Sequence, residues 1–112
     1  MRCNKQRKGP VGELVPIFCK VHGSLGKEIL AVCDKELCGK VLKAGEIEFS
    51  VSEFFYRGEE ILEQALKEKL KEFDNVNLVG NKAVGIALEE KVVVPESVIE
   101  ISGVKHVQMF KI

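Results

Sequence analysis

The stretch SVSEFFYRGEEILEQALKEKLKEFDNVNLVGNKAVG, residues 50–85, decides the fold class. Within it, residues 59–73 repeat apolar side chains at the spacing that lines one side of an α-helix. These positions are Ile61, Leu62, Ala65, Leu66, Leu70 and Phe73. The short apolar run 76–79 is typical of a buried strand, and residues 82–91 form a second amphipathic pattern. Helix, strand and helix in direct succession indicate helices that pack on a sheet.

The sequence before this stretch predicts a β-hairpin. Residues 14–21 and 28–33 are apolar runs, and the turn-forming residues 23–26 join them. Residues 34–42 fit a short helix or turn, because Asp34 is a residue type that caps a helix N-terminus.

Three further segments complete the predicted sheet. Residues 46–51 alternate acidic and apolar side chains, which places the apolar set on one face of a strand. Residues 98–101 and 106–112 are two more strand candidates near the end of the chain. The whole order predicts an α+β or α/β domain, in which an N-terminal hairpin joins a mixed sheet and two main helices pack on it.

Length and charge distribution indicate one domain with a basic tail. The chain has 112 residues, of which 46% are hydrophobic and 30% charged, as in a folded globular protein. The formal net charge is +0, but residues 1–45 hold nine basic and four acidic residues, against eight and thirteen in 46–112. Much of the basic excess lies in residues 1–12, which show no apolar periodicity. We therefore expect a flexible basic tail at 1–12 and a single domain over 13–112.

The composition also predicts a location. We find no apolar stretch of membrane-spanning length, and the basic tail lacks the apolar core and cleavage site of a secretory signal. These features predict a cytoplasmic protein without a membrane partner. In such a reducing compartment the four cysteines are expected to be thiols rather than disulfides.

Several strings of the sequence together resemble one known family. They are SEFFYRG at 52–58, NLVGNKAV at 77–84 and GVKHVQMFKI at 103–112, preceded by AVCDKELCGKVLKAG at 31–45. Over residues 14–112 the chain resembles an archaeal family of uncharacterised proteins, the domain of unknown function 424. The resemblance implies an archaeal source and a single-domain fold, and it implies no activity.

The family pattern also directs attention to particular positions. Those that match it are Phe54, Phe55, Tyr56, Gly58, Asn77, Gly80, His106 and Gln108. The four cysteines do not belong to the pattern, and the basic tail at 1–12 is a departure from it.

Cysteine and histidine residues offer a candidate zinc site. Cys19 and His22 form one pair of ligands, Cys33 and Cys38 form another, and a hairpin can bring two such pairs together. The spacing departs from the two tight Cys-x2-Cys turns of a zinc ribbon, and Cys19 lies within an apolar strand. We therefore expect buried thiols, and neither a metal nor another cofactor.

The start of the second helix is a candidate anion site. The order strand, glycine, helix places unpaired backbone amides after a tight turn, so Gly80, Asn81 and Lys82 could bind a phosphate or an RNA backbone. The alternative is a structural turn in which Asn81 caps the helix. The sequence lacks both the P-loop and the dinucleotide-binding glycine pattern. The string GSLG at 23–26 has the letters of a KH loop but joins two strands, so we interpret it as a hairpin turn.

His106 and Gln108 are the most promising pair of polar residues in the sequence. They lie two residues apart in a predicted strand, so both project to one face, and Val107 and Met109 project to the other. Histidine acts as an acid, a base or a ligand near neutral pH, and glutamine can orient a substrate or contact a base edge. Sequence spacing assigns no nucleophile or carboxylate partner to His106, which favours recognition over catalysis.

Three consecutive aromatic residues, Phe54, Phe55 and Tyr56, follow a candidate helix cap at Ser52. They cannot all point into one core from a single element, so we expect at least one to face outward. Tyr56 and Arg57 are residue types that stack on a nucleic-acid base or anchor a protein partner. For Phe54 and Phe55 we favour a hydrophobic staple beneath the main helix.

Together these observations predict a non-catalytic binding module for a protein or RNA assembly. The predicted binding residues are Tyr56, Arg57, Asn77, Gly80, Asn81, Lys82, His106 and Gln108. Residues 13–112 hold thirteen basic and seventeen acidic side chains, so an RNA surface would have to be local, and a protein partner is at least as well supported. The alternative is a small enzyme or ligand-binding protein with His106 as the acid or base, helped by Asn77 or Gln108. A flat patch with exposed Tyr56 and basic neighbours would favour the module. His106 at the bottom of a concave pocket, with a polar partner in reach, would favour the enzyme.

Overall fold

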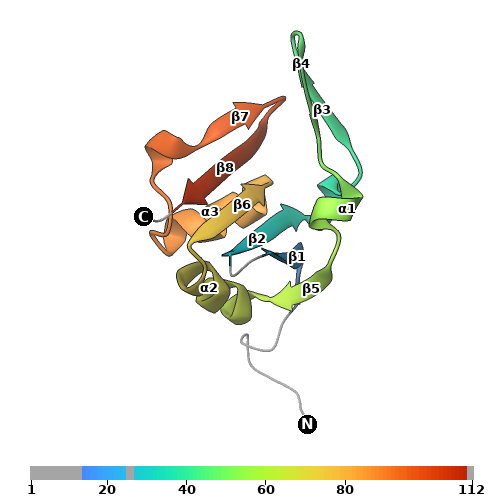
Figure 1. Cartoon of the computed structure of the whole chain (residues 1–112). Helices are drawn as coiled ribbons and strands as arrows, with labels where there is room; N and C mark the ends of the chain where they lie inside the picture. The colour runs from blue at the N-terminus through green and yellow to red at the C-terminus, as the bar shows by residue number, and fades with distance from the viewer. Residues whose placement is uncertain (1–13, 25–26, 111–112) are drawn as a thin grey trace.

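The amphipathic segment 59–73 begins as a strand and then becomes a helix. In the computed structural model, which describes residues 14–24 and 27–110, Glu59–Leu62 is strand β5 and Glu63–Glu72 is helix α2 (Figure 1). The predicted helix was therefore wrong over its first four residues, because the backbone of β5 pairs with strand β1, Leu14–Ser24. Leu66 and Leu70 of α2 are buried, as the periodicity predicts.

The N-terminal hairpin is confirmed. Strand β1 pairs antiparallel with β2, Lys27–Asp34, and the register runs to the pair Ser24 and Lys27. The turn residues 25–26, like the predicted basic tail, lie outside the described residues.

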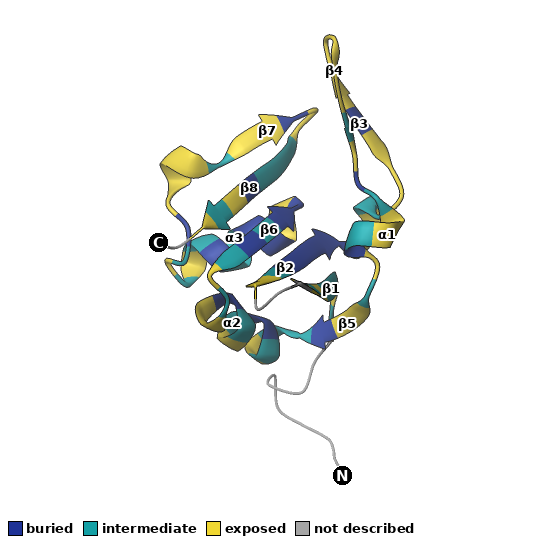
Figure 2. Cartoon of the chain, in the orientation of Figure 1, coloured by how far each residue is buried: buried dark blue, intermediate teal, exposed yellow. Residues whose placement is uncertain are grey.

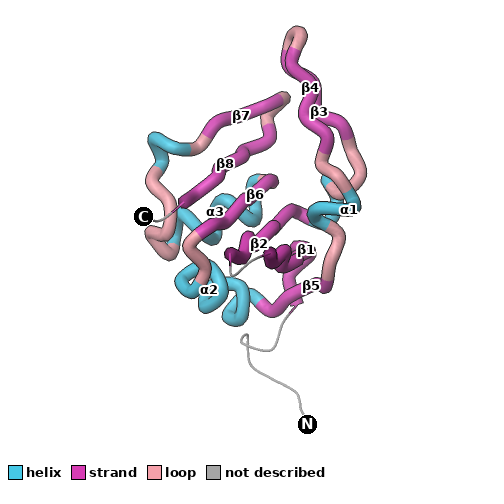
Figure 3. Tube along the Cα trace, viewed as in Figure 1, coloured by secondary structure: helices cyan, strands magenta, loops and turns pink. Residues whose placement is uncertain are grey.

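A second hairpin follows the first. A 3-10 helix, Lys35–Leu37, leads into β3, Val41–Ala44, which pairs antiparallel with β4, Ile47–Ser50. The strand predicted at 46–51 is confirmed in β4. The helix or turn predicted over 34–42 is only the short 3-10 helix, because its C-terminal residues form β3. Figure 3 shows this two-stranded hairpin projecting beyond the rest of the molecule.

Six strands form one mixed sheet in the order β5-β1-β2-β6-β8-β7. The remaining strands are β6, Asn75–Val79, β7, Ile99–Ile101, and β8, Val104–Phe110. Strands β2 and β6 are parallel, and the other neighbours in this sheet are antiparallel. The protein is a single α+β domain, as the sequence predicts. Among the described residues, we find no helix of the length and apolar character needed to cross a membrane.

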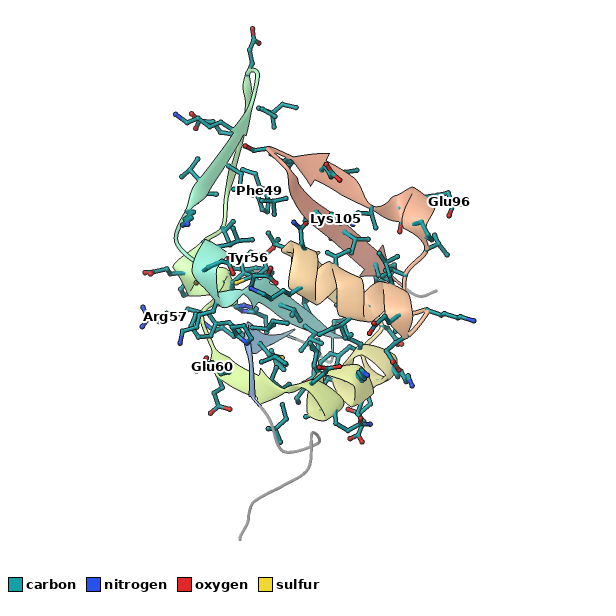
Figure 4. All side chains as sticks on the ribbon, turned by 180° about the vertical axis from the view of Figure 1, so that it is seen from behind. Phe49, Tyr56, Arg57, Glu60, Glu96 and Lys105 are labelled. Atoms are coloured by element: carbon teal, nitrogen blue, oxygen red, sulfur yellow. The ribbon has the colours of Figure 1, made fainter. Side chains whose placement is uncertain are left out.

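The two main helices cover one face of this sheet. Helix α3, Asn81–Glu89, lies behind β6 in Figure 1 and in front of the sheet in Figure 4, which is seen from behind. Together with α2 it buries apolar side chains of β1, β2, β6 and β8 in the larger core. A smaller core on the other face gathers under the β3–β4 hairpin and the short helix α1, Glu53–Tyr56. Figure 2 shows buried residues concentrated in β2 and β6, with the hairpin tip exposed.

A buried carboxylate joins the sheet to helix α3. Asp34 ends β2 and is 4% exposed, and its two oxygens accept hydrogen bonds from the backbone amides of Lys82 at 3.1 Å and Ala83 at 2.9 Å. Burial raises the pKa of Asp34, although the two amide bonds oppose this shift by stabilising the charged form. Asp34 therefore caps α3 rather than the 3-10 helix that follows it, to which its side chain gives no cap bond.

Gly80 makes room for this carboxylate. A Cβ atom at Gly80 would lie 2.3 Å from Cγ of Asp34, and the Gly80 backbone has a φ of 118°, which side-chain-bearing residues rarely adopt. Both facts require glycine at the turn between β6 and α3.

We predict that Gly80→Ala destabilises the fold by about 2 kcal/mol or more, because the new methyl group displaces Asp34 and strains the backbone. Gly85→Ala is the matched control, since Gly85 lies inside α3 and nothing stands within 4 Å of a Cβ added there. That change should stabilise the helix by roughly 0.5–1 kcal/mol. Urea unfolding of both variants measures the difference, and equal stabilities would contradict the close approach of Gly80 to Asp34.

We also predict that Asp34→Ala lowers the free energy of unfolding by about 2 kcal/mol, because it leaves two helix amides without their acceptor. Glu36→Ala is the control, since Glu36 contacts the same residue, Lys82, through an exposed ion pair of 2.7 Å. Exposed pairs contribute little, so this variant should unfold close to the wild type. Thermal or urea unfolding tests the contrast, and a similar loss in both variants would contradict the capping role of Asp34.

Candidate binding face

Strand β8 carries the predicted polar pair on the sheet face that α2 and α3 leave uncovered. In the register with β6, Gln108 lies opposite Asn77 and His106 lies opposite Val79. Val107 and Met109 pack into the core on the helical side, so the side chains of His106 and Gln108 project to the other face. Gln108 is exposed there, whereas Asn77 and His106 are half-buried.

Asn77 links two of the predicted residues. Its Oδ1 atom accepts a hydrogen bond from the Tyr56 hydroxyl at 2.8 Å and lies 3.1 Å from Nε2 of His106. Because an amide oxygen has no proton to give, His106 carries its proton on Nε2 and donates it to Asn77. Tyr56, Asn77 and His106 therefore form one hydrogen-bonded group from helix α1 and strands β6 and β8.

The imidazole of His106 is covered on one side. The ring of Phe49, in strand β4, lies 4.8 Å from it between centroids. With Nε2 protonated, Nδ1 is an acceptor, and among the described residues it is buried without a hydrogen-bond partner. Burial lowers the pKa of His106, because water no longer stabilises the charged imidazolium. His106 is therefore held neutral at pH 7.

Tyr56 is buried rather than exposed. Its side chain is 3% exposed, and burial raises the pKa of its hydroxyl. It packs edge-on against Phe55, whose ring stacks on His22 at 4.5 Å. Tyr56 thus positions Asn77, and its ring is not available for stacking with a partner.

Phe54 is the aromatic residue of this segment that faces outward. It is 80% exposed, whereas the sequence favoured a staple for it. The ammonium of Lys20 lies 5.0 Å from its ring centroid and donates a hydrogen bond to its carbonyl at 2.6 Å. The predicted cap is confirmed, since Oγ of Ser52 accepts a bond from the backbone amide of Phe55 at 3.3 Å.

The remaining predicted residues contact other parts of the chain. The Asn81 side chain accepts a bond from the Lys105 amide at 3.0 Å, and Gly80 rather than Asn81 is the N-cap position of α3. Lys82 pairs with Glu36, and the guanidinium of Arg57 lies 3.6 Å from Glu53. Since Asp34 accepts the amides of Lys82 and Ala83, these two donors of the helix start are already used.

Among the residues that were considered for zinc, the structure separates Cys19 from Cys33 and Cys38. Cys19 packs against the core on the helical side, whereas Cys33 belongs to the core on the opposite face. His22 stacks on Phe55. Burial raises the pKa of Cys19 to about 11, as expected for a thiol within a core. In the part of the chain that the structure describes, we find no group of three or more cysteine, histidine or acidic residues that could hold a metal ion.

A cavity of about 310 Å³ opens where the uncovered face meets the end of α2. Its lining residues are Lys27, Glu28, Glu72, Phe73, Asp74, Asn75 and Phe110. Sequence reasoning missed this site, because the lining comes from β2, α2, β6 and β8. One local signal was present: Glu72 and Asp74 place negative charge at a helix C-terminus, where the helix dipole disfavours it.

Comparisons with known proteins place the chain in a family. A family model described as a protein of unknown function, DUF424, matches residues 22–112. No curated protein matches the sequence. A similar solved structure is that of an uncharacterized conserved protein from the archaeon Methanopyrus kandleri, with a TM-score of 0.70 and 26% sequence identity. The match covers 84% of this chain and 90% of that one. The chain therefore belongs to the DUF424 family.

Proposed function

We propose that this protein is a non-catalytic binding module, and that its partner, a protein or RNA assembly, docks on the sheet face that α2 and α3 leave uncovered. The observation that carries this proposal is the set of side chains exposed on that face. Phe110 is 69% exposed and Ile99 is 54% exposed, and Gln108 lies between them in the sheet register. Large apolar side chains that share an open sheet face are typical of an interaction surface.

The hydrogen-bonded group on this face supports recognition. Tyr56 and His106 both donate to the single oxygen Oδ1 of Asn77, which fixes the amide beside exposed Gln108. Side chains that are held in one conformation lose little entropy when a partner binds, and this improves affinity.

The alternative, an enzyme with His106 as acid or base, has one observation in its favour. Nδ1 of His106 carries a lone pair without a partner among the described residues, and a general base requires such a lone pair. However, the same atom is buried, and Phe49 lies over the ring. A substrate would have to displace the groups that bury Nδ1 to reach it. We therefore propose a structural role for His106 within the binding module.

The binding proposal predicts that Phe110→Ala/Gln108→Ala loses the partner. Tagged wild-type protein and the double variant are used for affinity capture from native cell lysate, with quantitative mass spectrometry and RNA sequencing of the retained material. We expect one specific protein or RNA assembly to be at least about tenfold depleted with the double variant, because the exposed face is the contact surface.

The matched control is Val21→Ala/Gln64→Ala, which also removes one exposed apolar and one exposed polar side chain. Gln64 belongs to α2, and Val21 lies beside Ala65 and Lys69 of the same helix, so both are on the helical side of the sheet. This variant should capture the same assembly as the wild type. Equal recovery with all three proteins would refute the uncovered face as the binding surface.

A structural role for His106 predicts a specific pH dependence of stability. Since its folded-state pKa is lowered from 6.5, the unfolded chain takes up a proton first as the pH falls, and folding stability decreases below about pH 6.5. The loss stops growing once the folded imidazole is also protonated. His106→Gln should remove this part of the decrease. Urea midpoints of both proteins at about pH 7.5 and about pH 5.5 measure it, and identical pH dependence would contradict the buried neutral imidazole.

A further inference from the structure

We infer that the partner is a basic protein segment, and that the cavity between the end of α2 and the uncovered face takes an arginine side chain from it. This inference rests on the proposed binding function and gives the chemical class of the partner. The cavity adjoins the proposed surface, because Phe110 of β8 is exposed on that surface and also lines the cavity.

Three carboxylates give the cavity its charge. They are Glu28 of β2, Glu72 at the end of α2 and Asp74 in the following bend. None of the three forms an ion pair with another described residue. Lys27 is the only cation among the described residues of the lining, so there three negative charges face one positive charge.

The position of two of these carboxylates is unfavourable for the free protein. Glu72 is the last residue of α2 and Asp74 lies two residues beyond it, and both face the negative end of the helix dipole. Lys69 and Lys71 in the last turn satisfy the dipole better, and Lys71 pairs with Glu90 at 3.0 Å. A cationic ligand would balance the negative charges of Glu72 and Asp74, which no ion pair among the described residues balances.

The remaining lining matches a guanidinium group. Asn75 also lines the cavity, and its Oδ1 atom has no hydrogen-bond partner among the described residues. Because this atom is buried, the amide has to turn toward the cavity before a guanidinium can donate to it. Phe73 and Phe110 add aromatic surface, on which a planar guanidinium stacks. Lys69 lies 6.0 Å from the Phe73 ring centroid, which leaves the more exposed ring of Phe110 as the stacking surface.

The lining also indicates whether the cation is a metal ion or an arginine side chain. In the described part of the chain, the acidic side chains do not converge closely enough to hold a metal ion. An arginine side chain instead has five donors on a rigid fork, which reaches separated acceptors such as Asp74 and Asn75.

Overall charge favours a basic protein over RNA as the partner. The full chain has a formal net charge of +0, but its described part holds sixteen carboxylates and twelve lysine or arginine side chains, so this part repels phosphate. The cavity concentrates this negative charge beside the proposed binding face.

The test is a titration of the full, ¹⁵N-labelled chain followed by NMR. The probes are the acetylated and amidated tripeptide Ala-Arg-Ala, the same peptide with citrulline in place of arginine, and a short single-stranded oligouridylate. Citrulline has nearly the same shape as arginine but no charge. We expect the arginine peptide to shift the amide signals of Asp74, Asn75 and Phe110 saturably, and the citrulline peptide to bind at least about fivefold more weakly.

Two variants separate the cavity from general electrostatic attraction. Glu72→Gln/Asp74→Asn should weaken the arginine peptide at least about fivefold and should also raise the Tm of the free protein, because charge is removed from the helix C-terminus. Glu96→Gln removes one exposed carboxylate away from the cavity and should leave the affinity unchanged.

Three results would overturn the inference. They are equal binding of the arginine and citrulline peptides, unchanged affinity in Glu72→Gln/Asp74→Asn, and saturable shifts of the cavity signals by oligouridylate alone. Each would leave the binding module itself in place, because that proposal fails only if Phe110→Ala/Gln108→Ala captures its partner as the wild type does.

Discussion

The hydrogen bonds from the start of α3 to the buried carboxylate of Asp34 are the interaction on which the rest of the structure depends. Asp34 ends β2 and is 4% exposed, so its charge is stable only while the amides of Lys82 and Ala83 donate to it. This contact holds the N-terminus of α3 against the parallel pair β2–β6 and allows only glycine at position 80. As a result α3 covers one face of the sheet together with α2. On the other face, the end that the β3–β4 hairpin and α1 do not cover stays open.

The open face is ordered by two contacts that come from outside the sheet. Helix α1 brings the Tyr56 hydroxyl to Asn77, and the β3–β4 hairpin brings the Phe49 ring over His106. Both elements cover only one end of the face, where they lie over the smaller core. Phe110 at the other end remains exposed beside the acidic cavity, so the protein combines a rigid polar centre with an uncovered apolar and anionic end.

The sequence predicted elements where the pattern is local, and it failed where pairing is distant. The apolar period of residues 59–73 continues through Glu59–Leu62, yet these four residues pair with β1 because Val15 and Leu14 lie opposite Ile61 and Leu62. The shared face of His106 and Gln108 was predictable, because side chains two residues apart in a strand always project to the same side. The burial of Tyr56 was not, because its hydroxyl partner Asn77 lies 21 residues further along the chain.

By itself the sequence determined the α+β class, the first hairpin, the amphipathic helix α2 and the family. Periodicity, turn residues and short strings such as residues 52–58 are properties of neighbouring residues. Only the tertiary structure decided that Asp34 caps a helix 48 residues away, that Phe54 rather than Tyr56 faces outward, and that four separate elements line one acidic cavity. The physical reason is that each of these features depends on which segments pack together. Packing minimises the free energy of the whole chain and leaves no pattern within one segment.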